Sequence, residues 1–162
     1  MGPRADTVVT GQGLLEGPVW REATGDLLVT VVGAGHLLRV DVEAGSTDRF
    51  AETHGGPNGA HPCTDGGVLV TQNGGLDWDA IGIPNPAPSL PTTPGIQRVD
   101  PDGSVTLLTG GAGPFGAPND LVVSADGAVL FTDPPQFPRP VEPLGRVWRW
   151  VPGGRPEVVA DG

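Results

Sequence analysis

The chain has a single cysteine, no lysine and no long run of apolar residues. The lone Cys63 excludes an intrachain disulfide and a cluster of thiolate ligands. No apolar stretch approaches the roughly 20 residues that a membrane-spanning helix needs, and residues 1–10 lack the apolar core of a secretory signal peptide. These absences lead us to expect a cytoplasmic protein with no membrane partner.

Positive charge is also scarce. All nine basic residues are arginine, they face nineteen acidic residues, and the net charge is −10. So acidic a chain repels nucleic acid and anionic membrane surfaces, and we expect neither as a partner. The 27 glycines and 19 prolines disfavour long helices and predict many tight turns. At 162 residues, the chain is long enough for one domain with a sizeable core.

Two stretches share one pattern, in which a Pro-Asn pair precedes an apolar strand, an Asp-Gly turn and a second apolar strand. The pattern covers residues 56–72 and recurs 61 positions later, without a gap, at residues 117–133. A third copy lies at residues 15–30, where Glu16 stands in place of the asparagine. Repetition with a period of about 40–60 residues is typical of propellers and solenoids.

Each copy opens a unit of four predicted strands, so the chain is predicted to be all-β, with three four-stranded blades of a β-propeller. The units are expected at about residues 11–52, 53–110 and 111–162. Their strands are predicted at 18–20, 27–32, 36–42 and 47–51, then at 59–62, 68–72, 96–99 and 105–108, and finally at 121–124, 129–132, 146–151 and 157–160. A short leading strand is expected at Thr7–Thr10.

Pro- and Gly-rich insertions separate the second and third strands of the later two units, at residues 73–95 and 134–145. The first contains Trp78 and other apolar residues, which favour an ordered lid loop over a disordered linker. Strand alternation puts Trp148 and Trp150 on one face, and this predicts packing between blades.

Strand order predicts where the polar residues gather. In an up-and-down blade, the loop entering the first strand and the loop between strands two and three lie at the same end. Glu16, Asn58 and Asn119 enter first strands, and Asp133 ends a second strand. Oxygen ligands that converge from separate blades are what a hard cation such as Ca²⁺ requires. A bound cation of this kind polarises carbonyl groups and activates water.

The chain resembles the gluconolactonase/regucalcin (senescence marker protein) family in three motifs: Leu-Glu-Gly-Pro-Val-Trp at 15–20, Pro-Asn-Gly at 57–59, and Pro-Asn-Asp-Leu-Val-Val at 118–123 followed by Phe-Thr-Asp-Pro-Pro at 131–135. The resemblance covers almost the whole chain, but only the first half of a family member. It implies a β-propeller of the six-bladed type that hydrolyses lactones or related sugar-acid substrates, a carboxylic-ester hydrolase activity. It also implies a divalent metal, usually Ca²⁺, with Zn²⁺, Mg²⁺ and Mn²⁺ as alternatives.

The resemblance assigns roles to particular residues. Glu16 matches a metal-binding glutamate, and Asn119 matches an asparagine that faces both metal and substrate. We place Asn58 and Asp133 with Asn119 as substrate-binding residues. The family's next two ligands, one of them an aspartate that is also the candidate general base, belong to later blades, so the catalytic residues stay unknown. Some members carry an arginine where this chain has Ala117.

Three blades are too few to close a ring, because propellers close with roughly four to eight. Three interpretations therefore stay open: the N-terminal half of a metal-dependent lactone hydrolase, a non-catalytic propeller segment used for binding or assembly, or an inactive truncated product. A homodimer that completes the ring is a further expectation, with Thr7–Thr10 completing the partner's last blade.

Overall fold

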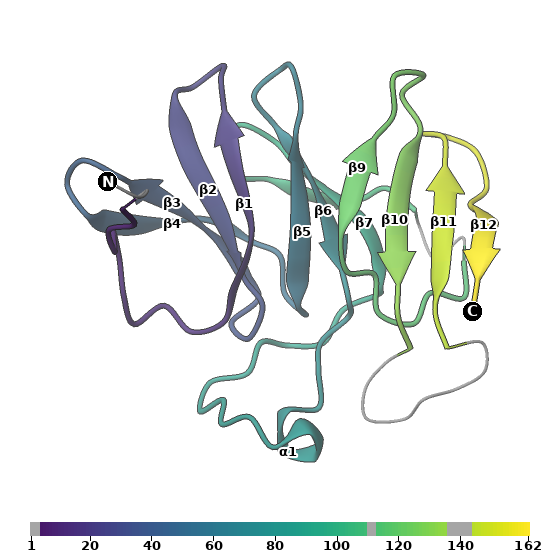
Figure 1. The fold of residues 1–162 in the computed structure, drawn as a ribbon, viewed down its shortest axis with the longest axis horizontal. Helices are drawn as coiled ribbons and strands as arrows, with labels where there is room; N and C mark the ends of the chain where they lie inside the picture. The colour runs from purple at the N-terminus through teal and green to yellow at the C-terminus, as the bar shows by residue number, and fades with distance from the viewer. Residues whose placement is uncertain (1–3, 110–112, 136–143) are drawn as a thin grey trace.

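Three separate four-stranded antiparallel sheets make up the computed structural model, which describes residues 4–109, 113–135 and 144–162 (Figure 1). The first sheet contains β1 (Leu15–Arg21), β2 (Asp26–Val31), β3 (His36–Asp41) and β4 (Ser46–Glu52). The second contains β5 (Pro57–Pro62), β6 (Val68–Gln72), β7 (Gly95–Val99) and β8 (Val105–Leu107). The third contains β9 (Leu121–Val123), β10 (Val129–Asp133), β11 (Arg146–Trp150) and β12 (Glu157–Asp161). Within each sheet, neighbours in sequence are neighbours in space, which confirms the predicted propeller blades.

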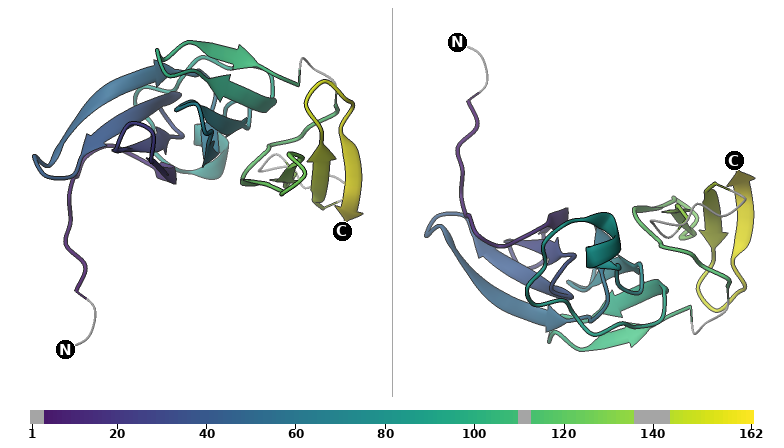
Figure 2. Two further views of the ribbon diagram at one scale, coloured as in Figure 1. Left: turned by 90° about the horizontal axis from the view of Figure 1, so that it is seen from above. Right: turned by 90° about the horizontal axis from the view of Figure 1, so that it is seen from below.

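The sheets pack face to face in an open arc, which Figure 2 shows from above and below. One core cluster joins the first sheet to the second, and its buried members are Val19, Leu28, Leu37, Ala51, Val68, Val70 and Val99. A second joins Ile96 of the second sheet to the third sheet's Leu121, Val129, Phe131, Trp148 and Trp150. Burying one such side chain fully contributes about 1.5–3 kcal/mol. The predicted packing role of Trp148 and Trp150 is therefore confirmed.

The predicted strand at Thr7–Thr10 is wrong. These residues have no strand pairing, and the first sheet is completed by β1 to β4 alone. Val9 instead packs on the outer face of that sheet, against the cluster Val29, Val31, Leu38 and Val40. A short β-branched segment forms a strand only beside a sheet edge that it can pair with, and here it lies across a sheet face.

Each sheet carries the same ion pair at the turn between its first two strands. The aspartate of that turn binds an arginine on the third strand, at 2.9 Å for Asp26 and Arg39. The distances are 2.7 Å for Asp65 and Arg98, and 2.7 Å for Asp126 and Arg149. The sequence interpretation did not foresee this third element of the repeat.

Arg21 joins the first two sheets at the same end. Its side chain is 2% exposed and donates to both carboxylate oxygens of Asp26. It also donates to the Gly66 carbonyl of the second sheet at 2.8 Å, and its guanidinium lies 4.6 Å from the centre of the Phe50 ring. Arg39 donates to one of the same two oxygens of Asp26 and lies 4.9 Å from the centre of the Phe50 ring, but its side chain is 41% exposed.

The insertion after β6 is ordered, as predicted. It contains the short helix α1 (Trp78–Ile81), which Asp77 caps and whose Trp78 is buried. The Asn85 side chain and the Ser89 amide both donate to the Gly33 carbonyl, which ties the loop to the first sheet. The second predicted insertion lies mostly outside the described residues.

Candidate functional site

The three residues that enter the first strands lie next to one another, from sheet to sheet. Glu16 belongs to β1, Asn58 to β5, and Asn119 lies two residues before the start of β9. Strand β1 contacts β5, and β5 contacts β9. The Gly59 amide donates to the Asn119 carbonyl at 2.7 Å, so the second and third entries are joined directly.

A repeated threonine fixes these entry residues by their backbone. The Thr30 hydroxyl on β2 donates to the carbonyl of Asn58 at 2.7 Å. The Thr71 hydroxyl, at the same position on β6, donates to the carbonyl of Asn119. The first and second sheets thus each hold the entry residue of the following sheet through its main-chain oxygen, without using its side chain.

Glycines after the first two entry residues allow this close approach. A Cβ on Gly17 would lie 2.3 Å from the Asn58 carbonyl oxygen, and one on Gly59 would lie 2.5 Å from a carboxylate oxygen of Asp120. The register of both strands also shifts here, between Glu16 and Val19 in β1 and just after Pro57 in β5. Such bulges re-aim side chains and are common beside active sites.

The side chains of Glu16, Asn58 and Asn119 make no hydrogen bond or ion pair with any described residue. Glu16 and Asn119 are exposed, and Asn58 is half-buried. One carboxylate and two amide oxygens are the hard donors that Ca²⁺ takes, and they would fill part of its shell of 6–8 oxygens. No group of three or more His, Cys, Asp or Glu that could hold a metal occurs in the described ranges, so a cation here would rely on the amide oxygens.

Asp133 lies behind Asn119 and is 5% exposed. Its carboxylate accepts from the amides of Gly116 and Ala117, at 3.0 and 2.7 Å, and from the indole N–H of Trp148 at 2.9 Å. The side chain predicted to contact substrate therefore has donors on both oxygens.

A pocket of about 340 Å³ opens beside Asn119. It is lined by Asn119, Thr132, Asp133, Pro134, Leu144, Gly145 and Arg146. Arg146 was not among the site residues predicted from the sequence, although its position at the start of a third strand places it at the same end of the sheet as Asn119. Its guanidinium lies near the Trp148 ring, 5.7 Å from the ring centre, while Ala117 is buried.

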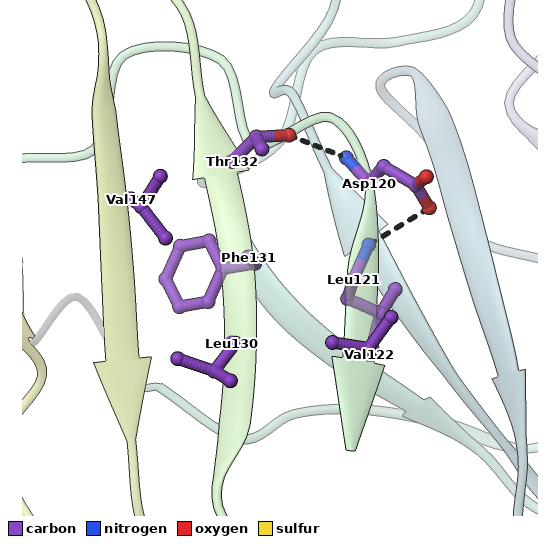
Figure 3. A pocket seen from close by; sticks show the side chains of 7 residues that line it. All are labelled: Asp120, Leu121, Val122, Leu130, Phe131, Thr132 and Val147. Carbon is purple, nitrogen blue, oxygen red and sulfur yellow. Dashed lines mark hydrogen bonds between the residues drawn. The ribbon is translucent and has the colours of Figure 1, made fainter. Parts of the chain in front are cut away.

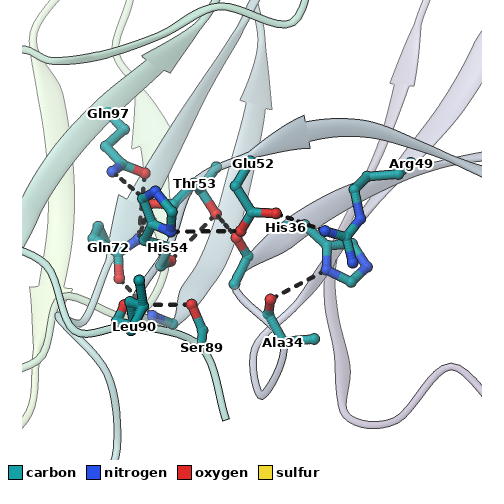
Figure 4. Close-up of polar contacts among 12 residues, drawn as sticks. Ala34, His36, Arg49, Glu52, Thr53, His54, Gln72, Ser89, Leu90 and Gln97 are labelled. Atoms are coloured by element: carbon teal, nitrogen blue, oxygen red, sulfur yellow. Dashed lines mark hydrogen bonds and ion pairs between the residues drawn. The ribbon is translucent and has the colours of Figure 1, made fainter. Parts of the chain in front are cut away.

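A buried amide network supports the second sheet at the same end (Figure 4). Gln72 is fully buried, and its side-chain oxygen accepts from the amides of Gly56 and Gly74 at 2.6 and 2.9 Å. Its amino group donates to the carbonyl of His54 at 2.9 Å and to the side-chain oxygen of Gln97 at 3.3 Å. His54 has a left-handed backbone with φ of 56°, which this network holds in place.

The remaining titratable candidates fit structural roles. Burial lowers the pKa of His36 and of His61, which favours neutral rings. Burial raises the pKa of the Cys63 thiol, which makes it a poor nucleophile at neutral pH.

The outer face of the third sheet carries a separate shallow pocket of about 170 Å³ (Figure 3). Its lining is largely apolar: Asp120, Leu121, Val122, Leu130, Phe131, Thr132 and Val147. Val122 is 57% exposed, so this face is open to solvent. The pocket faces away from the core cluster between the second and third sheets.

The profile of the SMP-30/gluconolactonase/LRE-like region matches residues 14–162. Among solved structures, a gluconolactonase from Xanthomonas campestris is 26% identical, with a TM-score of 0.73 over 96% of this chain and 50% of that one. The calcium-binding protein regucalcin from Agrobacterium tumefaciens is 16% identical, with a TM-score of 0.62 over 91% and 43%. Virginiamycin B lyase from Staphylococcus aureus is 16% identical, with a TM-score of 0.52 over 89% and 40%.

The chain thus spans about half the length of the gluconolactonase that it matches. A search of curated proteins returned no match. None of the helices in the described part of the chain is long and apolar enough to cross a membrane.

Proposed function

Because this chain belongs to the SMP-30/gluconolactonase/LRE-like family, we propose that it binds a divalent cation, Ca²⁺ first among them, and takes part in hydrolysing a lactone. The observation that carries the proposal is the row formed by Glu16, Asn58 and Asn119. Their main chains are fixed by neighbouring sheets, whereas their side-chain oxygens have no partner among the described residues.

The chain's own residues would act by binding and orientation. Glu16 and Asn119 hold the cation, and Asn58 orients the substrate from the adjacent strand. When bound, the cation supplies the Lewis acidity that polarises a lactone carbonyl. Arg146, in the pocket beside Asn119, is placed to bind the carboxylate that lactone hydrolysis releases.

Isothermal titration calorimetry with CaCl₂, paired with thermal unfolding, tests the cation site. A ligand that binds only the folded state raises the melting temperature, and the stabilisation grows with the logarithm of the ligand concentration divided by Kd. Glu16→Gln keeps the shape of the side chain and removes its charge, so it should abolish the Ca²⁺-dependent rise. Glu157→Gln is the matched control, because Glu157 is an exposed glutamate on β12.

Lactonase activity is measured separately, by proton release from a sugar lactone in a pH-stat. We expect Ca²⁺-dependent proton release that Glu16→Gln abolishes and Glu157→Gln retains. Equal Ca²⁺ responses in the two variants would show that Glu16 is not a ligand. Calcium binding without lactone turnover would favour the non-catalytic interpretation.

A further inference from the structure

Gln72 and Asp133 occupy equivalent positions in the second and third sheets. Each is the last residue of the second strand, and they stand 61 positions apart, the offset that also separates Asn58 from Asn119. They are 0% and 5% exposed. Two buried polar side chains at one repeated position need a common explanation, because an apolar residue would be less costly to bury there.

Both side chains accept from the backbone two residues before a site asparagine. The Gln72 oxygen accepts from the amide of Gly56 at 2.6 Å, and Gly56 precedes Asn58 by two positions. The Asp133 carboxylate accepts from the amide of Ala117 at 2.7 Å, and Ala117 stands in the same relation to Asn119. The backbone that leads to each asparagine is therefore held by the same kind of hydrogen bond, from a backbone amide to a buried side chain.

The third strand of each sheet supplies a matching second contact. Gln97 pairs with Val70, and Trp148 pairs with Phe131, again 61 positions on from Val70. Gln97 accepts from the Gln72 amino group at 3.3 Å, and the Trp148 indole donates to Asp133 at 2.9 Å. In both sheets, a side chain of the third strand therefore also contacts the buried anchor, by which we mean Gln72 in the second sheet and Asp133 in the third.

The first sheet has no buried polar side chain at the end of its second strand. Its second strand ends in Val31, and Glu16 is instead paired directly with Thr30 in the β1–β2 ladder. The buried anchor thus occurs in the two sheets whose entry residue is an asparagine.

We infer that Gln72 and Asp133 are positioning residues, which set Asn58 and Asn119 through the backbone that leads to them. The inference rests on the proposed function for the role of those asparagines, but not for the restraint itself. Asp133 acts on the site through the backbone of Gly116 and Ala117, and both of its carboxylate oxygens already accept hydrogen bonds.

The test variant is Asp133→Asn. It keeps the side-chain shape but turns one acceptor into a donor that faces an N–H group. The control is Val129→Ala, which removes buried methyl groups from the same strand without touching the loop before Asn119. Amide hydrogen exchange by NMR is measured for Gly116 and Ala117, and Ca²⁺ affinity is measured by calorimetry.

Asp133→Asn should speed exchange at both amides and weaken Ca²⁺ binding by about 10- to 100-fold, the range for residues that orient metal ligands. Val129→Ala should lower the melting temperature and change neither quantity. Unchanged exchange in Asp133→Asn, or the same affinity as Val129→Ala, overturns the inference.

The two proposals fail separately. If the wild type binds no Ca²⁺, the proposed function is wrong, whereas exchange at Gly116 and Ala117 still decides the restraint. If Asp133→Asn does not fold, Trp148→Phe replaces it, because it removes one donor and keeps an aromatic ring. Trp148→Phe should cause a smaller loss of affinity and faster exchange at Gly116, and no change in either overturns the inference.

Discussion

Arg21 should contribute far more to stability than Arg39, although both arginines bind Asp26 and both stack on Phe50. The difference lies in burial, since their side chains are 2% and 41% exposed. Only Arg21 also reaches the second sheet, through the carbonyl of Gly66. Arg21→Met and Arg39→Met therefore form a matched pair.

The magnitude follows from what each change leaves behind. Removing one partner of a buried ion pair costs about 3–5 kcal/mol. Asp26 keeps Arg39 and the Thr24 hydroxyl as partners, so we expect the lower end, about 3 kcal/mol, for Arg21→Met. An exposed pair contributes about 0–1 kcal/mol, and Arg39→Met should stay within that range.

Urea unfolding followed by tryptophan fluorescence measures both losses, provided that the denaturant slope is the same for both variants. Arg21→Met should shift the midpoint strongly and Arg39→Met only slightly. Losses within about 1 kcal/mol of each other would refute the assignment of Arg21 as the buried link between the first two sheets.

Three other predictions follow from the structure. Hydrogen bonds from Ser124 and Arg149 lower the pKa of Asp126 to about 2. The stability that its carboxylate contributes is therefore present above the pKa of the unfolded state and is lost as the pH falls toward about 2. The melting temperature of Asp126→Asn should accordingly fall less steeply than that of the wild type between about pH 4 and pH 2. Thr71→Val should cost about 1–2 kcal/mol in chemical denaturation, because the carbonyl of Asn119 loses a buried donor. Thr106→Val, at an exposed position on β8, is the control and should change stability by less than about 0.5 kcal/mol. We also propose that two copies close a six-bladed ring. Light scattering should then give twice the monomer mass, and a stable monomer, or only polydisperse aggregate, would contradict this.

Much of the fold follows from local sequence. The 61-residue repeat, the Asp-Gly turns and the alternation of apolar residues were enough to locate all four strands of each sheet, with the ends shifted by a few residues. Thr7–Thr10 was misassigned because β-propensity does not report whether a free sheet edge is nearby. Only the tertiary arrangement shows that Val9 covers a sheet face.

The candidate site was only partly predictable. The positions of Glu16, Asn58 and Asn119 followed from strand order, and the structure brings their strands together. The buried contacts of Asp133 depend on how a distant backbone loop folds against it, which no local pattern encodes. Arg146 escaped notice because an arginine at the start of a strand is usually a solvated surface residue.

The threonine contacts to the carbonyls of Asn58 and Asn119 separate the scaffold from the chemistry. Because these contacts between sheets use the main-chain oxygen of the entry residue, its side chain is free to vary without breaking them. These positions are therefore natural places to reprogram charge and ligand preference, because the framework that presents them does not depend on which side chain is presented.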